Sequence, residues 1–188
     1  MTTETKAAKP KVERYREGKG TVGSFISDAY SEITGLGEEF REIYDNATEG
    51  LQQTQVNQTR SETADACESL SEPSVNSSIL DEIECSTMLD MGKTYRGRQT
   101  QSRACRADNA ASMFNAAADA VRQWVEDHPM LDDNATKQEK KDHDAMLEAN
   151  GWDADAFSEA HDEADQVISE CEDCASEIEG MEWPGMFG

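Results

Sequence analysis

The residue types that could bind a metal or perform catalysis are few in this chain, and their spacing suits neither role. Cys171 and Cys174 have the C-x-x-C spacing of zinc sites, but a structural zinc ion needs four ligands, commonly from a second such pair or from two spaced histidines. The other cysteines, Cys67, Cys85 and Cys105, stand alone, and the three histidines form no matching pair. Five cysteines, an odd number, also favour reduced thiols over a disulfide framework. We therefore expect packed thiols at 171 and 174, with no bound metal and no cofactor.

Two further stretches match ligand-binding motifs only in part. Met91-Gly-Lys-Thr94 has the end of a phosphate-binding P-loop, but Thr87 stands where that motif requires its first glycine. The acidic residues between 132 and 144 lack the alternate spacing and the turn glycine of a calcium-binding EF-hand. No Ser, Cys or His is placed so as to suggest a nucleophile beside its base. The sequence therefore predicts a protein that is not an enzyme.

A basic island, residues 93–106, contains five cations and no acidic residue. These cations are Lys93, Arg96, Arg98, Arg103 and Arg106. Tyr95 lies among them, so contact with phosphate groups or RNA is one interpretation. The formal net charge of the whole chain is −23 at pH 7, which disfavours general binding of nucleic acid. The preferred interpretation is that these cations pair with acidic helices or with an acidic patch on another subunit.

The densest negative charge lies in residues 142–188, which contain fifteen Asp or Glu and no Lys or Arg. Eleven of these acids fall in residues 153–179, where a helix about 40 Å long would carry one charge per about 3.7 Å. That spacing is close to the interval of about 3.4 Å between phosphates along one DNA strand. The face could therefore imitate DNA, or it could simply be a solvated surface. The acids that we expect to bind a partner are Glu159, Asp162, Glu163, Glu170, Asp173 and Glu177.

Residues 181–188 form an apolar, aromatic tip after this acidic helix. Large apolar groups such as Trp183 and Phe187 lower solubility unless they are covered. One interpretation is that the tip folds back onto the chain's own hydrophobic seam. The other is that Trp183 and Phe187 bind a partner, and both are candidate binding residues for that reason.

The elements that position these groups are helices with narrow apolar seams. Residues 1–20 are polar and basic, which suggests a flexible arm. Apolar residues then recur at steps of four and three, the spacing of a coiled-coil seam. They are Val22, Ile26, Ala29, Ile33, Leu36, Phe40, Ile43 and Ala47. Gly50 suits the end of this helix. A second, weaker helix through Val56, Thr63, Cys67 and Leu70 ends before Pro73, which gives an antiparallel hairpin.

The second half of the chain predicts another helical hairpin. Residues 83–91 alternate with a period of two, so residues 21–92 comprise the first hairpin and an extended or β segment. After the basic island, the apolar spacing predicts a helix that ends at His128-Pro129. Its seam positions are Ala107, Ala110, Phe114, Ala117, Val121 and Trp124. A short helix over 136–149, closed by Gly151, precedes the long acidic helix over 153–179, capped by Gly180. Its seam is Phe157, Ala160, Ala164, Val167, Cys171, Ala175 and Ile178.

Together these patterns predict an all-α, elongated bundle of two antiparallel coiled-coil-like hairpins, within 21–92 and 107–180, with a short extended segment. The long seam over 22–47 also favours a homodimer. No signal peptide or membrane-spanning segment is evident, so we expect an intracellular protein without membrane contact. The acidic surface favours a basic protein as the partner.

Three stretches carry a resemblance to other proteins. They are Phe25-Ile-Ser-Asp-Ala-Tyr-Ser-Glu-Ile33, Glu38-Glu-Phe-Arg-Glu-Ile-Tyr-Asp-Asn46 and Glu179-Gly-Met-Glu-Trp-Pro-Gly-Met-Phe-Gly188. Together with a small-residue helix after a basic segment, they resemble small acidic proteins of unassigned function encoded by bacteriophages and mobile elements. The resemblance covers most of residues 20–188, includes no diagnostic chemical motif and implies no activity. It suggests a viral setting, in which acidic proteins act as DNA mimics that block host defence enzymes, or as virion parts.

The preferred hypothesis is a phage binding protein or inhibitor in the host cytoplasm. Its acidic face would occupy a basic, DNA-binding surface of a host protein. The main alternative is a structural or assembly component of a virus particle. A third is a salt-adapted cytoplasmic helical protein.

Overall fold

The computed structural model describes residues 13–95, 98–132 and 134–185, and this part of the chain is mostly helical. Its helices are α1 (Val22–Asp45), α2 (Glu49–Gln52), α3 (Gln55–Ser69), α4 (Ser78–Asp81), α5 (Arg103–Asp127), α6 (Lys137–Asn150) and α7 (Ala154–Gly180). Its strands are β1 (Tyr15–Thr21), β2 (Glu84–Asp90), β3 (Lys93–Tyr95) and β4 (Arg98–Thr100). None of the helices described is long and apolar enough to cross a membrane.

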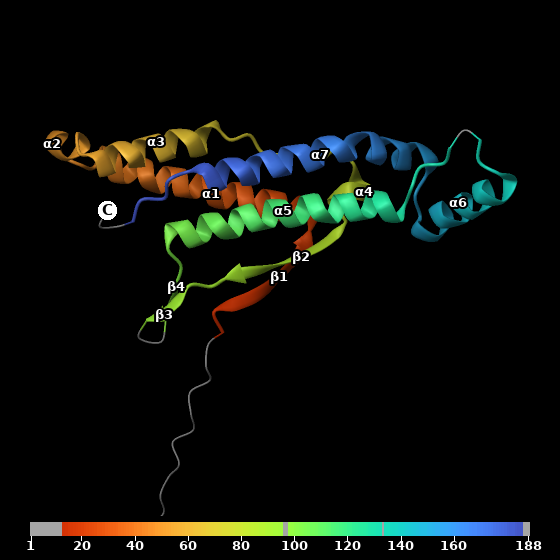
Figure 1. Ribbon diagram of the computed structural model, residues 1–188, viewed down its shortest axis with the longest axis horizontal. Helices are drawn as coiled ribbons and strands as arrows, with labels where there is room; N and C mark the ends of the chain where they lie inside the picture. The colour runs from red at the N-terminus through yellow and green to blue at the C-terminus, as the bar shows by residue number, and fades with distance from the viewer. Residues whose placement is uncertain (1–12, 96–97, 133, 186–188) are drawn as a thin grey trace, which may run out of the picture.

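The long helices lie side by side along the length of the molecule, and α6 projects at one end (Figure 1). Helix α1 packs along both α3 and α5, and α5 packs along α7. Tyr30 lies opposite Leu70 and Arg41 lies opposite Asp65, so α1 and α3 run antiparallel. One continuous apolar core joins these helices. The expected elongated helical bundle is present, and supercoiling within its helix pairs stays a prediction.

Most of the seam positions that the periodicity predicted are buried, but the long helices also bury residues outside the seams, such as Phe25, Ala111, Ala118 and Cys174. In α1 the first six seam positions, from Val22 to Phe40, are buried, while Ile43 is half-buried. In α5 and α7 every seam position that the sequence indicates is buried. The α1 seam is filled by α3 and α5 of the same chain, so it is not open to a second copy. The reason for expecting a dimer through this seam is thereby removed.

The extended segment is confirmed as strand β2, and its partner is strand β1, in an antiparallel pair. The expectation of a flexible arm over 1–20 is therefore wrong for residues 15–20, which belong to β1, and the arm's first twelve residues lie outside the described part of the chain. The polar composition of β1 hides its strand character. Gly18 sits where a Cβ atom would come within 2.8 Å of Leu89 Cδ1, so a side chain there would clash with β2.

Three smaller features differ from the sequence-based expectations. Helix α1 ends at Asp45 with Asn46 as its cap, and Gly50 lies inside α2 instead of capping α1. The short helix α4 was not expected, because four residues are too few to show a period. The basic island is not one element: it contributes the β3–β4 pair and the first turn of α5.

Candidate functional site

Five carboxylates form a row along the solvent face of α7, opposite its buried seam. They are Asp155, Glu159, Asp162, Asp173 and Glu177, and we call them the acidic ridge. At 100° per residue they fall within an arc of about 60°, and they span about 33 Å of helix. All five are exposed, and none is paired with a cation of the described residues.

Glu163 and Glu170, two other acids expected to bind a partner, hold the chain's own loop instead. The Glu163 carboxylate accepts hydrogen bonds from the backbone N–H groups of Asn76 (2.7 Å) and Ser77 (2.8 Å) and from the Asn76 side chain (2.9 Å). Glu170 accepts one from the backbone N–H of Ser74 (3.0 Å). These carboxylates fix the segment between α3 and α4 against α7. In the structure both carboxylates bind this loop, and a role for them in binding a partner stays a prediction.

One carboxylate of α7, Glu172, is neutralised by an ion pair with a neighbouring helix. Arg122 of α5 pairs with Glu172 of α7 and with Asp119 one turn earlier in α5, at 2.7 Å. Asp153 is also engaged, because its carboxylate caps the first turn of α7. Four of the eleven acids, Asp153, Glu163, Glu170 and Glu172, are thus engaged within the chain, so the simple charge density of the sequence overstates what is free for a partner. Asp165 and Glu179 are exposed but lie outside the arc of the ridge.

Two cations of the basic island join α5 to α1. Arg106 pairs with Glu32 and Glu39, and Arg103 Nε lies 2.9 Å from Glu39 Oε2. Partial burial by itself raises the pKa of Glu39, but the hydrogen bonds and positive charges of Arg106 and Arg103 outweigh it, so the pKa lies below its usual value. Arg103 also lies over Phe40, with 5.2 Å from its guanidinium carbon to the ring centroid.

Arg103 and Arg106 thus pair with an acidic helix of the same chain, as the preferred interpretation has it, and contact of either with phosphate or an outside partner stays a prediction. Lys93 and Arg98 are exposed on the β3–β4 pair and take no part in the ion pairs that join α5 to α1. Arg96 lies outside the described residues. The island therefore does not present its cations as one surface.

The start of the aromatic tip folds back onto the bundle. The Trp183 ring lies 6.2 Å from that of Phe40, and its Nε1 donates to the carbonyl of Ile178 (3.2 Å). The Thr63 hydroxyl donates to the carbonyl of Glu182 (2.8 Å). Trp183 is half-buried against the core, which fits the interpretation that the tip folds back, and a role for it in binding a partner stays a prediction. Phe187 lies outside the residues that the structure describes.

The cysteine pair of α7 is packed into the core. Cys171 and Cys174 are both buried, and burial raises the pKa of their thiols to about 12 and about 11. A raised pKa leaves little thiolate, which is the reactive and metal-binding form. In the part of the chain described, no group of three or more His, Cys, Asp or Glu side chains is placed to hold a metal ion.

Sequence reasoning missed a cluster of aromatic rings where α5, α6 and α7 meet. The rings are those of Trp124, Trp152, Phe157, His128, His143 and His161, with neighbouring centroids 4.7 to 5.9 Å apart. His161 Nε2 bonds the carbonyl of His128 (2.7 Å), and His128 Nδ1 bonds that of Trp124 (2.9 Å). The histidines stand in polar stretches of sequence, which gave no signal of this packing. The cluster attaches α6 to the bundle.

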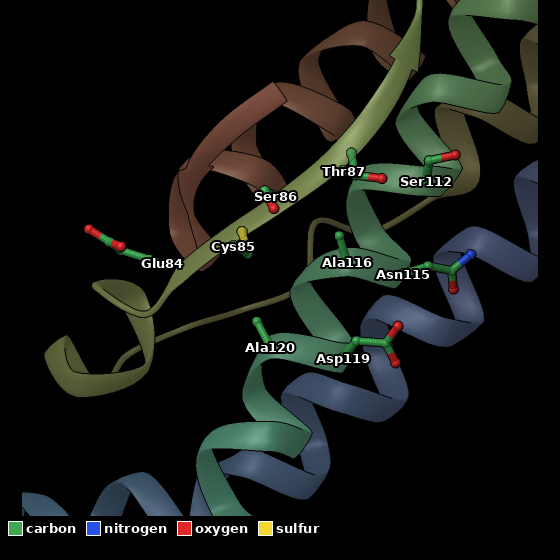
Figure 2. Close-up of a pocket in the computed structure, with 9 residues that line it drawn as sticks. All are labelled: Glu84, Cys85, Ser86, Thr87, Ser112, Asn115, Ala116, Asp119 and Ala120. Atoms are coloured by element: carbon green, nitrogen blue, oxygen red, sulfur yellow. The ribbon is translucent and has the colours of Figure 1, made fainter. Parts of the chain in front are cut away.

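A second missed feature is a groove of about 510 Å³ between β2 and α5. The strand contributes Glu84, Cys85, Ser86 and Thr87 to its lining, and the helix contributes Ser112, Asn115, Ala116, Asp119 and Ala120. Figure 2 shows the strand running alongside the helix, with the small Ala116 and Ala120 side chains directed toward the strand. The lining is mostly small and polar, which suits a backbone better than a bulky apolar ligand.

No protein-family model, no curated protein and no solved structure matches this chain.

Proposed function

We propose that the protein is a non-enzymatic binding protein whose acidic ridge occupies a basic, DNA-binding surface of another protein. The single observation that carries the proposal is the row of five exposed carboxylates without a cation partner among the described residues. If the viral setting of the resemblance applies, the partner is a host protein and the chain acts as an inhibitor in the host cytoplasm.

The support is geometric and electrostatic. The ridge stands on a helix whose other face is buried against α5, so its charges are held at fixed spacing by the core. Its span of about 33 Å is close to one turn of duplex DNA, about 34 Å. Within each of its two groups, 155–162 and 173–177, neighbouring ridge acids are about 5–6 Å apart, and about 16 Å of helix separates Asp162 from Asp173. A fixed row of like charge is what a protein surface built for a phosphate backbone binds.

The test uses a defined basic probe. A histone-like, non-specific DNA-binding protein is prebound to a fluorescent DNA duplex, and the chain is added as a competitor while anisotropy is recorded. We expect the chain to displace the duplex. Neutralising the ridge as D155N/E159Q/D162N/D173N/E177Q should raise the concentration for half displacement by about tenfold or more. Raising the salt from about 50 to about 200 mM should weaken displacement steeply.

A matched control removes five acids from another part of the surface. D28N/E38Q/E42Q/D45N/E62Q changes the net charge equally, at exposed positions of α1 and α3. We expect this variant to compete like the wild type. Equal losses for both variants would mean that only total charge matters, and the ridge would then have no special role.

The rival function, a structural or assembly component of a virus particle, predicts a different result. The chain would form large complexes of fixed stoichiometry with itself or with other particle proteins, measurable by light scattering. Displacement from the basic probe would then be no stronger than that of any equally acidic protein.

A further inference from the structure

The two-stranded ribbon leaves one edge of β2 open, and its hydrogen bonds show which residues form that edge. Met91 N–H donates to the Arg14 carbonyl (2.7 Å), and Val22 N–H donates to the Ile83 carbonyl (2.9 Å). In an antiparallel pair, alternate residues point their backbone groups toward the partner strand. The odd-numbered residues of β2 therefore face β1. Its even-numbered residues direct N–H and C=O away from β1.

At one end of this edge, the side chain of Asn109 makes the hydrogen bonds that a neighbouring strand would make. Asp90 N–H donates to Asn109 Oδ1 (2.8 Å), and Asn109 Nδ2 donates to the Asp90 carbonyl (2.9 Å). For Glu84, Ser86 and Met88, the outward backbone groups have no hydrogen bond within the described residues. The edge is thus satisfied at Asp90 and open over the preceding residues.

The open edge borders the groove between β2 and α5 (Figure 2). Ser112, Ala116 and Ala120 form the helical side, and their small side chains leave room beside the strand. Glu84 and Asp119 add two carboxylates. Arg122 reaches Asp119 but shares its single charge with Glu172, so the groove is acidic on balance.

We propose that the open edge of β2 binds an extended, basic peptide segment of another protein by strand addition. The backbone of the peptide would pair with Ser86 and its outward neighbours Glu84 and Met88, which is how exposed sheet edges bind peptides. A lysine or arginine of the peptide would lie beside Glu84 and Asp119. A second copy of this chain is a poor occupant, because each copy carries a net charge of −23.

The outer edge of β1 is the competing site, and it is less suited. Glu17 and Lys19 form an ion pair (3.1 Å) on that strand, and Thr21 N–H is capped by Ser24 Oγ (2.8 Å). Charged side chains of this kind protect natural edge strands from pairing. Within the described part of the chain, no long helix runs along β1, whereas β2 packs along α5. An added strand would therefore be covered on the β2 side only.

The test is amide hydrogen exchange by NMR on the wild-type protein, with a capped peptide of alternating lysine, threonine and valine as the probe. Before addition, the amides of Ser86 and Met88 should exchange fast and those of Cys85 and Thr87 slowly. With the probe bound, Ser86 and Met88 should gain about tenfold protection or more. The same peptide with alternate backbone nitrogens methylated keeps its charge, loses its donors and should give no protection.

Two variants test whether the carboxylates of the groove contribute to binding of the basic peptide. E84Q/D119N should weaken probe binding by about tenfold, whereas E126Q/D127N, an equal change at the far end of α5, should not. The proposal is wrong if protection appears at Glu17 and Lys19 instead, if Ser86 and Met88 stay unprotected, or if the methylated peptide binds equally well. The ridge variant should bind the probe normally, so failure here is distinct from failure of the ridge proposal.

Discussion

At the scale of single residues, acids of the same helix have different roles although their chemistry is the same. Glu159 and Glu163 are one turn apart in α7. Glu159 is exposed and has no hydrogen-bond partner among the described residues, whereas Glu163 accepts three hydrogen bonds from Asn76 and Ser77. The difference arises because Glu163 lies at the border of the buried seam, where the loop before α4 passes.

This contrast gives a paired prediction. Glu163→Ala should lower the free energy of unfolding by about 2 kcal/mol, because two backbone N–H groups and one side-chain amide lose a charged acceptor. Glu159→Ala should change it by less than about 0.5 kcal/mol, as expected for an exposed position without contacts. Urea denaturation of both variants measures the difference. Equal stabilities would show that the loop is not held by Glu163.

At the scale of elements, α1 and α5 are joined by the clamp of Glu39, Glu32, Arg103 and Arg106, in addition to their apolar seam. The sequence favoured pairing of these arginines with acidic helices, but with the residues more than 60 positions apart it did not indicate which carboxylates they meet. The charge of the clamp depends on pH, because Glu39 must be ionised to accept hydrogen bonds from both arginines.

The sign of that dependence follows from the lowered pKa of Glu39. A carboxyl whose pKa is lower in the folded state stabilises the fold above its usual pKa of 4.5, and this stabilisation is lost as the pH falls through the folded value. We expect the stability of the wild type to fall as the pH is lowered from neutral through 4.5 and below. Glu39→Gln should make this fall shallower. Glu38→Gln, the exposed neighbour, should leave it unchanged in thermal melts across that pH range.

Elements also differ in how well the sequence revealed them. The predicted seams follow steps of three and four over about five turns in α5 and about six in α7, and this spacing alone identified most of the buried residues. Strand β1 carries no such pattern, because Gly18, Gly20 and charged residues occupy it. It is a strand only because β2 pairs with it from about 70 residues away. Nothing local in a polar segment encodes such a partner.

At the scale of the whole molecule, the repulsion that comes with a net charge of −23 opposes the stabilisation that comes from one continuous apolar core. Mutual repulsion of the carboxylates destabilises the compact state, and salt screens it. Local ion pairs such as Arg41 with Asp65 and Glu68 offset part of this repulsion.

The dependence of folding stability on salt distinguishes a binding protein from a salt-adapted one. We expect the chain to stay folded at about 20 mM salt, with a melting temperature that rises by only a few degrees toward about 500 mM. Circular dichroism with thermal melts checks this. Loss of helix at low salt would favour the salt-adapted alternative, because the fold would then depend on screening.

The sequence by itself determined that the long helices exist and which face of each is buried, because the apolar spacing repeats within a single element. It also determined the excess of negative charge. Only the tertiary structure decided which charges are free: Glu163 and Glu170 bind a loop, Arg103 and Arg106 bind α1, and Trp183 covers Phe40. It likewise decided that β2 has an open edge beside α5. Each of these outcomes depends on contacts between segments far apart in the chain, and the spacing of residues within one segment carries no information about them.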